Sequence, residues 1–337
     1  MRLLAAMSGG VDSSVAAALA LDAGHDVVGV TLKLWGGETD SGCCTVADAD
    51  DARRVAQHLG VDHYVWSFAA EFEASVVSPY VEAHRAGRTP NPCVECNRHL
   101  KFGALLDRAR RLGFDAVVTG HHARLTGGEL RRGADPAKDQ SYVLAGLTAD
   151  QLSGMVLPVG HLTKDEVRAE AAARGLRTAV KAESQDLCFV ASGGRRAFLA
   201  DRAPLTPGQV VDTDGRAVGH VAGVELVTVG QRKGLGVAAG EPRYVLDVDP
   251  AGRVTVGSLD DLLVATQPLE DVAGPTPGER VWAQVSAHGH ARAGTVEADA
   301  VSWDEPQPRV APGQLVAFYA FDDPDGLVVG AATAARR

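Results

Sequence analysis

The stretch Ser8-Gly9-Gly10-Val11-Asp12-Ser13-Ser14 follows an apolar run, Arg2–Met7, and precedes an alanine-rich segment. This order predicts a strand, a glycine-bearing loop and a helix from about Ser14 to Ala23. Backbone N–H groups in such a loop can wrap a phosphate, and the helix N-terminus adds a favourable dipole. An ordinary capped helix start is the alternative, but the full string after an N-terminal strand favours a phosphate loop. It is not a Walker A loop or a Rossmann fingerprint, because neither GKS/GKT nor G-x-G-x-x-G is present.

The segments that follow continue to alternate between strand and helix patterns. Strands are expected at Val27–Leu34, His63–Phe68 and Ala116–Thr119, and helices at Ala47–Leu59, Asn97–Leu112 and Thr163–Arg174. Gly24 and Gly60 are expected to end helices, because glycine adopts the left-handed conformation at little cost. Thr163 and Glu166 have the spacing of a capping box. We therefore predict an α/β fold with a doubly wound, mostly parallel sheet over residues 1–191.

The pattern changes near Ser192, where glycine and proline begin to separate short β-rich runs. These runs include Arg243–Asp247, Arg280–Val285, Gly294–Ala298 and Leu315–Phe318. We predict two small β-rich domains, 192–258 and 259–337, joined near Ser258–Asp261, with the last one barrel-like.

The charge of the chain is unevenly distributed. The formal net charge is −10, which is unfavourable for a nucleic-acid-binding protein, but residues 81–140 carry eleven Lys+Arg against seven Asp+Glu. A locally basic surface on an acidic protein can still bind RNA. Charges interrupt every apolar run before it reaches the ~20 residues of a membrane span. No cleaved signal is expected either, so we predict a cytoplasmic protein without membrane association.

The five cysteines do not form a disulfide scaffold pattern. Cys93 and Cys96 form a CxxC in Thr89-Pro90-Asn91-Pro92-Cys93-Val94-Glu95-Cys96-Asn97, and Cys188 follows far along the chain. A zinc site is disfavoured because no second CxxC or His pair at zinc spacing is present. A thioredoxin-like redox pair is the other alternative. If the helix begins at Cys96 and Asn97, its dipole should favour the Cys96 thiolate.

The phosphate loop resembles the PP-loop of the N-type ATP pyrophosphatase superfamily, whose members transfer adenylate to a carbonyl oxygen. Nearly the whole chain resembles the tRNA-specific 2-thiouridylase family. The similar segments are Met7–Ser14, Gly87–Phe102, Thr119–His121, Lys138–Leu144, Leu157–Gly160, Ser184–Phe189, Gly230–Gly236 and Pro312–Tyr319. The resemblance implies a tRNA-uridine 2-sulfurtransferase that adenylates O2 of the wobble uridine and then transfers sulfur from a cysteine persulfide.

The same resemblance implies roles for individual residues. Cys188 would carry the persulfide, and Cys96 would release the product by forming a disulfide with Cys188. The ATP-binding residues would be Ala6, Met7, Ser8, Gly9, Gly10, Val11, Asp12, Ser13, Leu32 and Gly120. The tRNA-binding residues would be Asn91, Pro92, Cys93, His121, Lys138, Asp139, Gln140, His288, Gly289 and Gln314. ATP and Mg²⁺ would be required, and the partners would be the tRNA anticodon arm and a cysteine desulfurase or sulfur-relay protein.

One position departs from the family pattern. Many family members have aspartate where this chain has Cys93, and that aspartate is credited with handling a proton near the base. The change leaves two mechanisms open: persulfide chemistry, or a [4Fe–4S] cluster on Cys93, Cys96 and Cys188. A non-catalytic tRNA-binding protein is the alternative from another functional class.

Two further features have no role in the implied reaction. Gln231-Arg232-Lys233-Gly234 is a compact basic turn that could meet tRNA phosphates, although a solvated loop explains it nearly as well. His84 is expected to be a surface or core histidine.

Overall fold

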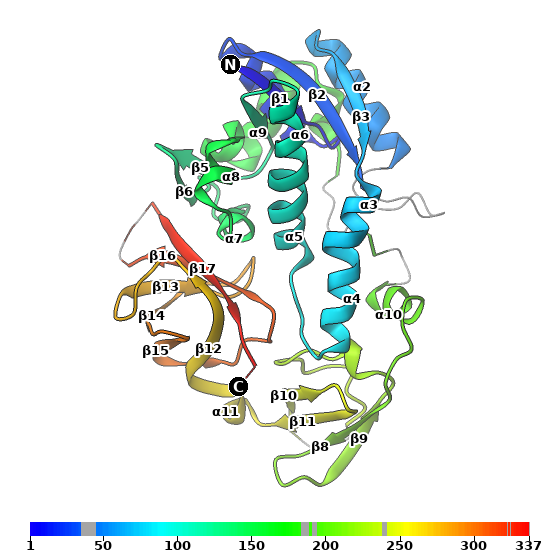
Figure 1. Cartoon of the computed structure of the whole chain (residues 1–337), viewed down its shortest axis with the longest axis vertical. Coiled ribbons are helices and arrows are strands. Elements are labelled where there is room, and N and C mark those ends of the chain that lie inside the picture. Colours follow the sequence, from blue (N-terminus) through cyan, green and yellow to red (C-terminus); the bar gives the residue numbers. More distant parts are fainter. Residues whose placement is uncertain are drawn as a thin grey trace. The chain divides into compact units, whose positions relative to one another are not determined.

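The computed structural model describes residues 1–34, 45–182, 189–190, 194–237, 241–321, 323 and 325–336. Its contacts divide the chain into two compact units (Figure 1). The first unit consists of Met1–Val76, Cys93–Ala191 and Pro324–Val328, and the second of Val77–Pro92, Ser192–Asp323 and Val329–Arg337. Cys43, Cys44 and Cys188 lie outside the described residues. The division into 1–191, 192–258 and 259–337 stays a prediction.

The first unit contains a five-stranded sheet in the order β3-β2-β1-β4-β7. Its strands are β1 (Arg2–Ala6), β2 (Asp26–Lys33), β3 (His63–Ser67), β4 (Ala116–Val118) and β7 (Met155–Val156). All four pairings are parallel, which confirms the predicted fold class. The chain moves outward from β1 to β2 on one side and to β4 on the other. The crevice beyond the carboxyl ends of β1 and β4 is therefore the topological switch point, where ligands of open α/β sheets bind.

Helices and a small hairpin complete this unit. The helices are α1 (Val11–Asp22), α2 (Val46–Leu59), α3 (Ala69–Phe72), α5 (Pro92–Glu95), α6 (Leu105–Arg111), α7 (Ser141–Leu144), α8 (Ala149–Ser153) and α9 (Lys164–Ala173). Short 3₁₀ turns occur at η3 (Pro158–His161) and η4 (Arg177–Val180). Two stretches are π-helical, η1 (Glu73–Val77) and η2 (Cys96–Ala104). The hairpin consists of β5 (Ala123–Thr126) and β6 (Glu129–Arg132).

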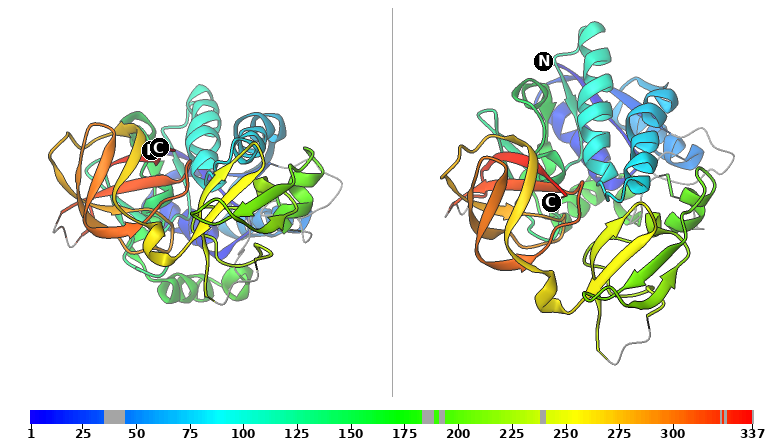
Figure 2. Two further views of the ribbon diagram at one scale, coloured as in Figure 1. Left: turned by 90° about the horizontal axis from the view of Figure 1, so that it is seen from below. Right: turned by 60° about the horizontal axis from the view of Figure 1, so that its bottom comes forward.

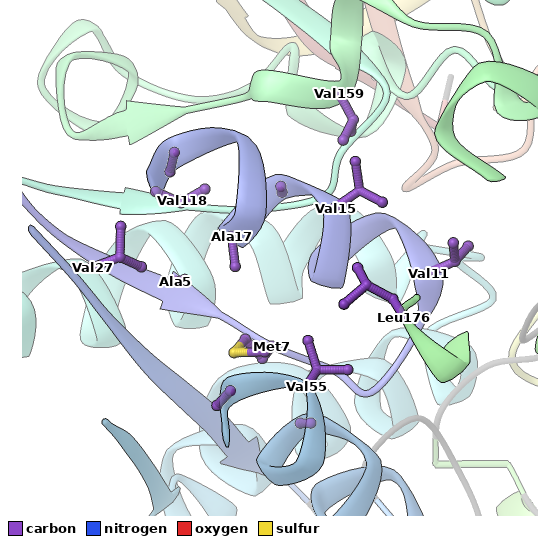
Figure 3. Packing of buried hydrophobic residues seen from close by; sticks show 14 of the residues in the cluster. Ala5, Met7, Val11, Val15, Ala17, Val27, Val55, Val118, Val159 and Leu176 are labelled. Atoms are coloured by element: carbon purple, nitrogen blue, oxygen red, sulfur yellow. The ribbon is translucent and has the colours of Figure 1, made fainter. Parts of the chain in front are cut away.

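The core of the first unit lies between the sheet and its helices. Figure 3 shows Val15 of α1 facing Val159 of η3, while Met7 after β1 lies close to Val55 of α2. All four side chains are at least 97% buried. This apolar packing attaches α1 to the sheet, so the loop between β1 and α1 is held at both ends.

The helix ends follow the predicted local chemistry. Thr163 and Glu166 form the expected capping box at the start of α9, and Gly24 and Gly60 adopt positive φ values of 79° and 72° after α1 and α2. The start of α1 differs from the prediction by about three residues. Gly10 has an extended backbone and serves as N-cap, so the helix begins at Val11 instead of near Ser14.

The helix predicted over Asn97–Leu112 begins earlier than expected. It starts at Pro92, continues through the π-helical stretch η2 and ends at Arg111. Proline suits the first helical position, because it has no N–H to leave unsatisfied and its φ is already helical. The expectation that Cys96 stands at the helix start is therefore wrong: Cys96 lies one turn inside, and Cys93 lies in the first turn.

The second unit is mainly β-structure, and its helices include α4 (Ser78–Arg85) and α10 (Gly194–Ala200). One sheet has the order β10-β11-β8-β9. Its strands are β8 (Gly208–Val211), β9 (Ala217–Val221), β10 (Tyr244–Asp249) and β11 (Arg253–Gly257). A short 3₁₀ turn, η5 (Val224–Leu226), follows β9, and α11 (Leu259–Leu262), capped by Ser258, begins at the predicted join.

The last part of the second unit is a closed six-stranded barrel in the order β12-β15-β14-β13-β16-β17, as Figure 2 shows in orange and red. Its strands are β12 (Leu263–Ala273), β13 (Arg280–Gln284), β14 (Arg292–Val296), β15 (Ala300–Pro308), β16 (Leu315–Ala320) and β17 (Val328–Ala334). Val281, Val301, Val316 and Phe318 fill its interior, each at most 1% exposed. The expectation of a barrel-like end is confirmed. None of the helices that the structure describes has the length and apolar character to span a membrane.

Candidate nucleotide site

The glycine loop after β1 is held by hydrogen bonds within itself. Ser8 N donates to Ser13 Oγ over 3.2 Å, and Ser13 Oγ donates to Gly10 O over 3.1 Å. The Ser14 hydroxyl donates to Gly10 O over 2.7 Å and is fully buried. The Ser14 hydroxyl therefore bonds the first turn of α1.

Two glycines allow close approach around this loop. Gly9 has a φ of 74°, and a Cβ there would lie 2.3 Å from Asp48 O of α2. A Cβ on Gly120, just beyond β4, would lie 2.5 Å from the Asp12 carbonyl carbon and 2.6 Å from Ser13 N. Both positions therefore exclude any larger side chain, since the obstructing atoms are backbone.

A pocket of about 350 Å³ opens at this switch point. Its lining includes the predicted residues Ala6, Met7, Ser8, Gly10, Val11, Asp12, Ser13, Leu32, Gly120, His121, Lys138 and Gln140. The remaining lining residues, which the sequence did not reveal, are Leu34, Lys101, Thr119, His122, Lys164, Lys181 and Ala182. Among the described lining residues, four are lysines and one, Asp12, carries a carboxylate. This charge balance suits a polyanion.

Asp12 and Lys164, which both line the pocket, form an ion pair. Lys164 Nζ lies 2.7 and 2.8 Å from the two carboxylate oxygens, and His122 Nε2 lies 3.1 Å from Oδ1. Burial would raise the pKa of Asp12, but hydrogen bonds from His122 and Lys164 outweigh it, so the pKa lies below its ordinary value. Asp12 therefore stays ionised at neutral pH.

Sequence alone gave one overlooked signal for Lys164. This lysine occupies the first position of α9, after the capping residue Thr163. A cation at a helix N-terminus is disfavoured by the helix dipole. A lysine fixed there by a capping box is consequently a candidate for binding an anion.

Lys181 connects the pocket to α2. Its Nζ lies 2.7 Å from both Asp48 Oδ1 and Asp51 Oδ2. Burial would lower the pKa of Lys181, but the two carboxylates outweigh it and raise the pKa above its usual range. Gly9 packs against the backbone of the same Asp48. Asp48 therefore holds both Lys181 and the glycine loop in place.

His121 is buried against the end of β4. Its Nδ1 lies 2.8 Å from Thr119 Oγ1, and burial, together with the positive charge of Lys101, lowers its pKa well below the ordinary value. His121 is therefore neutral at physiological pH and can exchange hydrogen bonds with a ligand without carrying charge.

The three residues Lys138, Asp139 and Gln140 divide between two roles. Lys138 and Gln140 line the pocket, and Gln140 Oε1 accepts from His122 N over 2.9 Å. Asp139 is absent from the lining. Its carboxylate accepts from Gly133 N and Ser141 N over 2.9 and 3.0 Å, and it pairs with Arg132 over 2.8 Å. Asp139 therefore holds the backbone that presents its neighbours.

The CxxC cysteines differ in accessibility. Cys93 is exposed, whereas Cys96 is buried. Among the described residues, no group of three or more His, Cys, Asp or Glu side chains is gathered as for a metal ion. Cys188 is not among them, so its proximity to Cys96 stays a prediction.

The remaining predicted residues belong to the second unit. Asn91 and Pro92 follow Thr89, whose N–H donates to Pro312 O over 2.7 Å. Gln314 Nε2 donates to Thr89 O, so this side chain supports the loop that carries Asn91. His288 is exposed, and Gly289 closes a turn by donating to Ser286 O over 3.1 Å.

Comparison with known proteins places this chain in a family. A model described as tRNA methyl transferase HUP domain matches residues 1–192, and one described as tRNA methyl transferase PRC-barrel domain matches residues 196–258. Two curated relatives, both tRNA-specific 2-thiouridylase MnmA, match along the full length. The Rhodococcus jostii protein is 50% identical over 99% of this chain and 97% of its own. The Mycobacteroides abscessus protein is 49% identical over 100% of both.

A solved NMN synthetase from Francisella tularensis is 20% identical, with a TM-score of 0.35, and covers 54% of this chain and 66% of that chain. A likeness this low transfers nothing to this chain. The full-length relatives decide the assignment: the chain belongs to the tRNA-specific 2-thiouridylase family.

Proposed function

We propose that this chain thiolates carbon 2 of the wobble uridine of tRNA, after adenylating O2 with ATP. The observation that carries the proposal is the switch-point pocket, where the glycine loop faces four lysines. Its chemistry suits a triphosphate, and the full-length relatives are named tRNA-specific 2-thiouridylases. As a tRNA sulfurtransferase, the chain needs both a nucleotide site and thiol chemistry.

ATP would lie across the loop Ala6–Ser13, with Leu32 and Gly120 beside the nucleotide. The N-terminus of α1 and the N–H groups of the loop favour phosphate oxygens. Gly9 does not line the pocket; it lets the loop pack on α2. Mg²⁺ neutralises triphosphate charge when bound. Asp12, whose carboxylate lines the pocket, would supply an oxygen ligand of the kind that this ion prefers.

In the first step, uridine O2 attacks the α-phosphorus of ATP and pyrophosphate leaves. Negative charge moves onto the leaving group, so cations around the phosphates stabilise the transition state. Lys164 and Lys181 are the residues we assign to this role, because both line the pocket and both are held in place by carboxylates. The product is an O2-adenylated uridine with AMP as leaving group.

In the second step, the terminal sulfur of a Cys188 persulfide attacks carbon 2 and AMP departs, leaving the sulfur bonded to both the base and Cys188. Cys96 then attacks the Cys188 sulfur. This forms the Cys96–Cys188 disulfide and releases the thiolated uridine. A thiol reductant resets the disulfide, and a cysteine desulfurase or relay protein supplies the next sulfur.

The tRNA contacts fall into three groups. Asn91, Pro92 and Cys93 would face the target base, and His121, Lys138, Asp139 and Gln140 would contact the anticodon arm from the pocket side. His288, Gly289 and Gln314 would contact it from the barrel. The support of Asp139 and Gln314 for neighbouring backbone favours an indirect contribution from these two side chains.

A reconstituted assay tests the proposal. Anaerobically purified protein is incubated with unmodified tRNA, Mg-ATP, cysteine and a cysteine desulfurase, while 2-thiouridine and pyrophosphate are quantified. Cys96→Ser and Cys188→Ser should abolish thiouridine, whereas Cys43→Ser/Cys44→Ser serves as the matched control and should keep it. Pyrophosphate without thiouridine in the wild type would reject the thiolation step while keeping adenylation.

A further inference from the structure

The basic turn Gln231-Arg232-Lys233-Gly234 is braced at several points. Gly230 N donates to Val245 O over 2.8 Å, and Val245 N donates to Gln231 O over 3.0 Å. The Gln231 side chain closes the turn from within, because Oε1 accepts from Thr228 N over 3.1 Å and Nε2 donates to Lys233 O over 2.8 Å. The turn therefore presents a fixed backbone.

Glycines make this conformation possible. Gly230, Gly234 and Gly236 have φ values of 86°, 77° and 63°, which side-chain-bearing residues rarely adopt. Three such residues within seven positions hold the chain in a tight path. The two cations at its tip consequently lose little backbone freedom when they bind a ligand.

Arg232 and Lys233 are exposed, and neither has an acidic side chain within ion-pair distance among the described residues. Other exposed arginines of the same sheet region are paired: Arg216 with Asp214 at 3.4 Å, and Arg253 with Asp249 at 3.8 Å. Arg232 and Lys233 therefore form a locally positive surface on a chain whose net charge is −10. They indicate attraction for an external anion.

A hollow of about 450 Å³ adjoins the turn. It is lined by Arg232, Gly234, Leu235, Gly236, Val237, Glu241, Pro242 and Arg243. Arg232 and Arg243 are cationic and Glu241 is acidic, so the described lining has a net positive charge that suits a phosphate.

The turn is connected to the loop that carries Asn91. Thr89 Oγ1 donates to Thr228 Oγ1 over 3.4 Å, and Thr228 is also reached by Arg195 Nη1 at 3.5 Å. Arg232 follows Thr228 by four residues, so their Cα atoms are at most about 14 Å apart. A nucleotide held beside Asn91 would therefore have neighbouring phosphates within reach of the turn.

We propose that Arg232 and Lys233 bind backbone phosphates of the tRNA arm that carries the target uridine. The proposal rests on the proposed function for the identity of the RNA. It assigns the turn a role that is independent of base sequence, since phosphate contacts position a nucleic acid without reading it.

Salt-dependent binding of full-length protein to unmodified tRNA tests this role. Fluorescence anisotropy gives the association constant between about 50 and about 200 mM salt, where each phosphate contact contributes about 0.7–0.9 to the slope of log K against log salt. Arg232→Gln/Lys233→Gln should flatten the slope by about 1.4–1.8. Arg216→Gln/Arg253→Gln, which removes two paired charges from the same region, should leave it near the wild-type value.

The outcomes separate this proposal from the proposed function. An unchanged slope in Arg232→Gln/Lys233→Gln, with wild type still binding and thiolating tRNA, overturns the role of the turn alone. Equal flattening in the control pair also overturns it, because net charge would then explain the loss. A wild type that neither binds nor thiolates tRNA overturns the proposed function instead. Arg232→Lys, which keeps the positive charge, should keep the wild-type slope if that charge binds phosphate.

Discussion

Lys164 Nζ contacts both carboxylate oxygens of Asp12, across a separation of 152 residues in sequence. The pair joins the first turn of α1 to the first turn of α9, within the lining of the switch-point pocket. A triphosphate would compete with Asp12 for this ammonium group, while Mg²⁺ would compete with Lys164 for the carboxylate. In the proposed function, the two groups of this pair would meet the two oppositely charged parts of Mg-ATP.

Replacing Lys164 should weaken use of ATP. Lys164→Met keeps the length of the side chain but removes a charged hydrogen bond, a loss of about 1.5–3 kcal/mol. We expect kcat/KM for ATP, measured by pyrophosphate release, to fall about 10- to 100-fold. Lys33→Met, an exposed lysine outside the pocket, is the control. Equal losses in both variants would contradict a specific role for Lys164.

Substitution of the glycines around the loop should affect folding unequally. Gly9→Ala and Gly120→Ala each place a Cβ within 2.5 Å of backbone, whereas Gly10→Ala meets only Ser8 Oγ at 3.4 Å. We expect the first two variants to lose about 1–3 kcal/mol of stability through forced backbone shifts. Thermal unfolding checks this expectation. A Tm of Gly10→Ala as low as that of Gly120→Ala would contradict it.

His84 should make stability depend on pH. Burial, reinforced by the charge of Arg195, lowers the pKa of His84 to about 4. Its Nδ1 lies 3.0 Å from Glu225 O, while Nε2 has no hydrogen-bond partner among the described residues. The unfolded chain therefore binds a proton between pH 6.5 and about 4 that the native chain does not bind. Stability falls as pH drops through this window, by on the order of 3 kcal/mol in total.

Urea unfolding at about pH 7 and about pH 5 measures this contribution. In His84→Asn, the amide nitrogen can still donate to Glu225 O, but no proton is taken up. The variant should therefore lose less stability than wild type between the two conditions. An identical loss would assign the pH dependence to other groups.

The iron content of the active protein distinguishes the persulfide mechanism from the [4Fe–4S] cluster mechanism. A persulfide mechanism requires no iron, so anaerobically purified protein without iron or labile sulfide should be fully active. Reconstitution with iron and sulfide should not increase thiouridine formation. Activity that scales with bound iron and disappears in Cys93→Ser would instead support the cluster on three cysteines.

The sequence predicted most reliably those features that depend on residues close together in the chain. The glycine loop, the Thr163 capping box and the β-strand-to-helix alternation each depend on residues within one short segment, and each appears in the structure. Lys164 and Lys181 were missed as pocket residues because their role arises only when α9 and the segment after η4 fold back on the loop. The early helix start at Pro92 was missed because proline was taken as part of the preceding loop, although it suits a first helical position.

The π-helical stretch Cys96–Ala104 has a consequence for how this helix tolerates change. An α-helix advances about 100° per residue, and a wider stretch shifts the angular phase between the segments on either side. Leu105, Leu106 and Ala109, after the wide stretch, are anchored in the core, whereas Cys93 precedes the stretch and Cys96 begins it. Deleting a single residue after Cys96, without a compensating change in winding, would rotate both thiols by about 100° relative to this anchor. The winding of this helix therefore sets the direction in which the Cys93 and Cys96 side chains project from its axis.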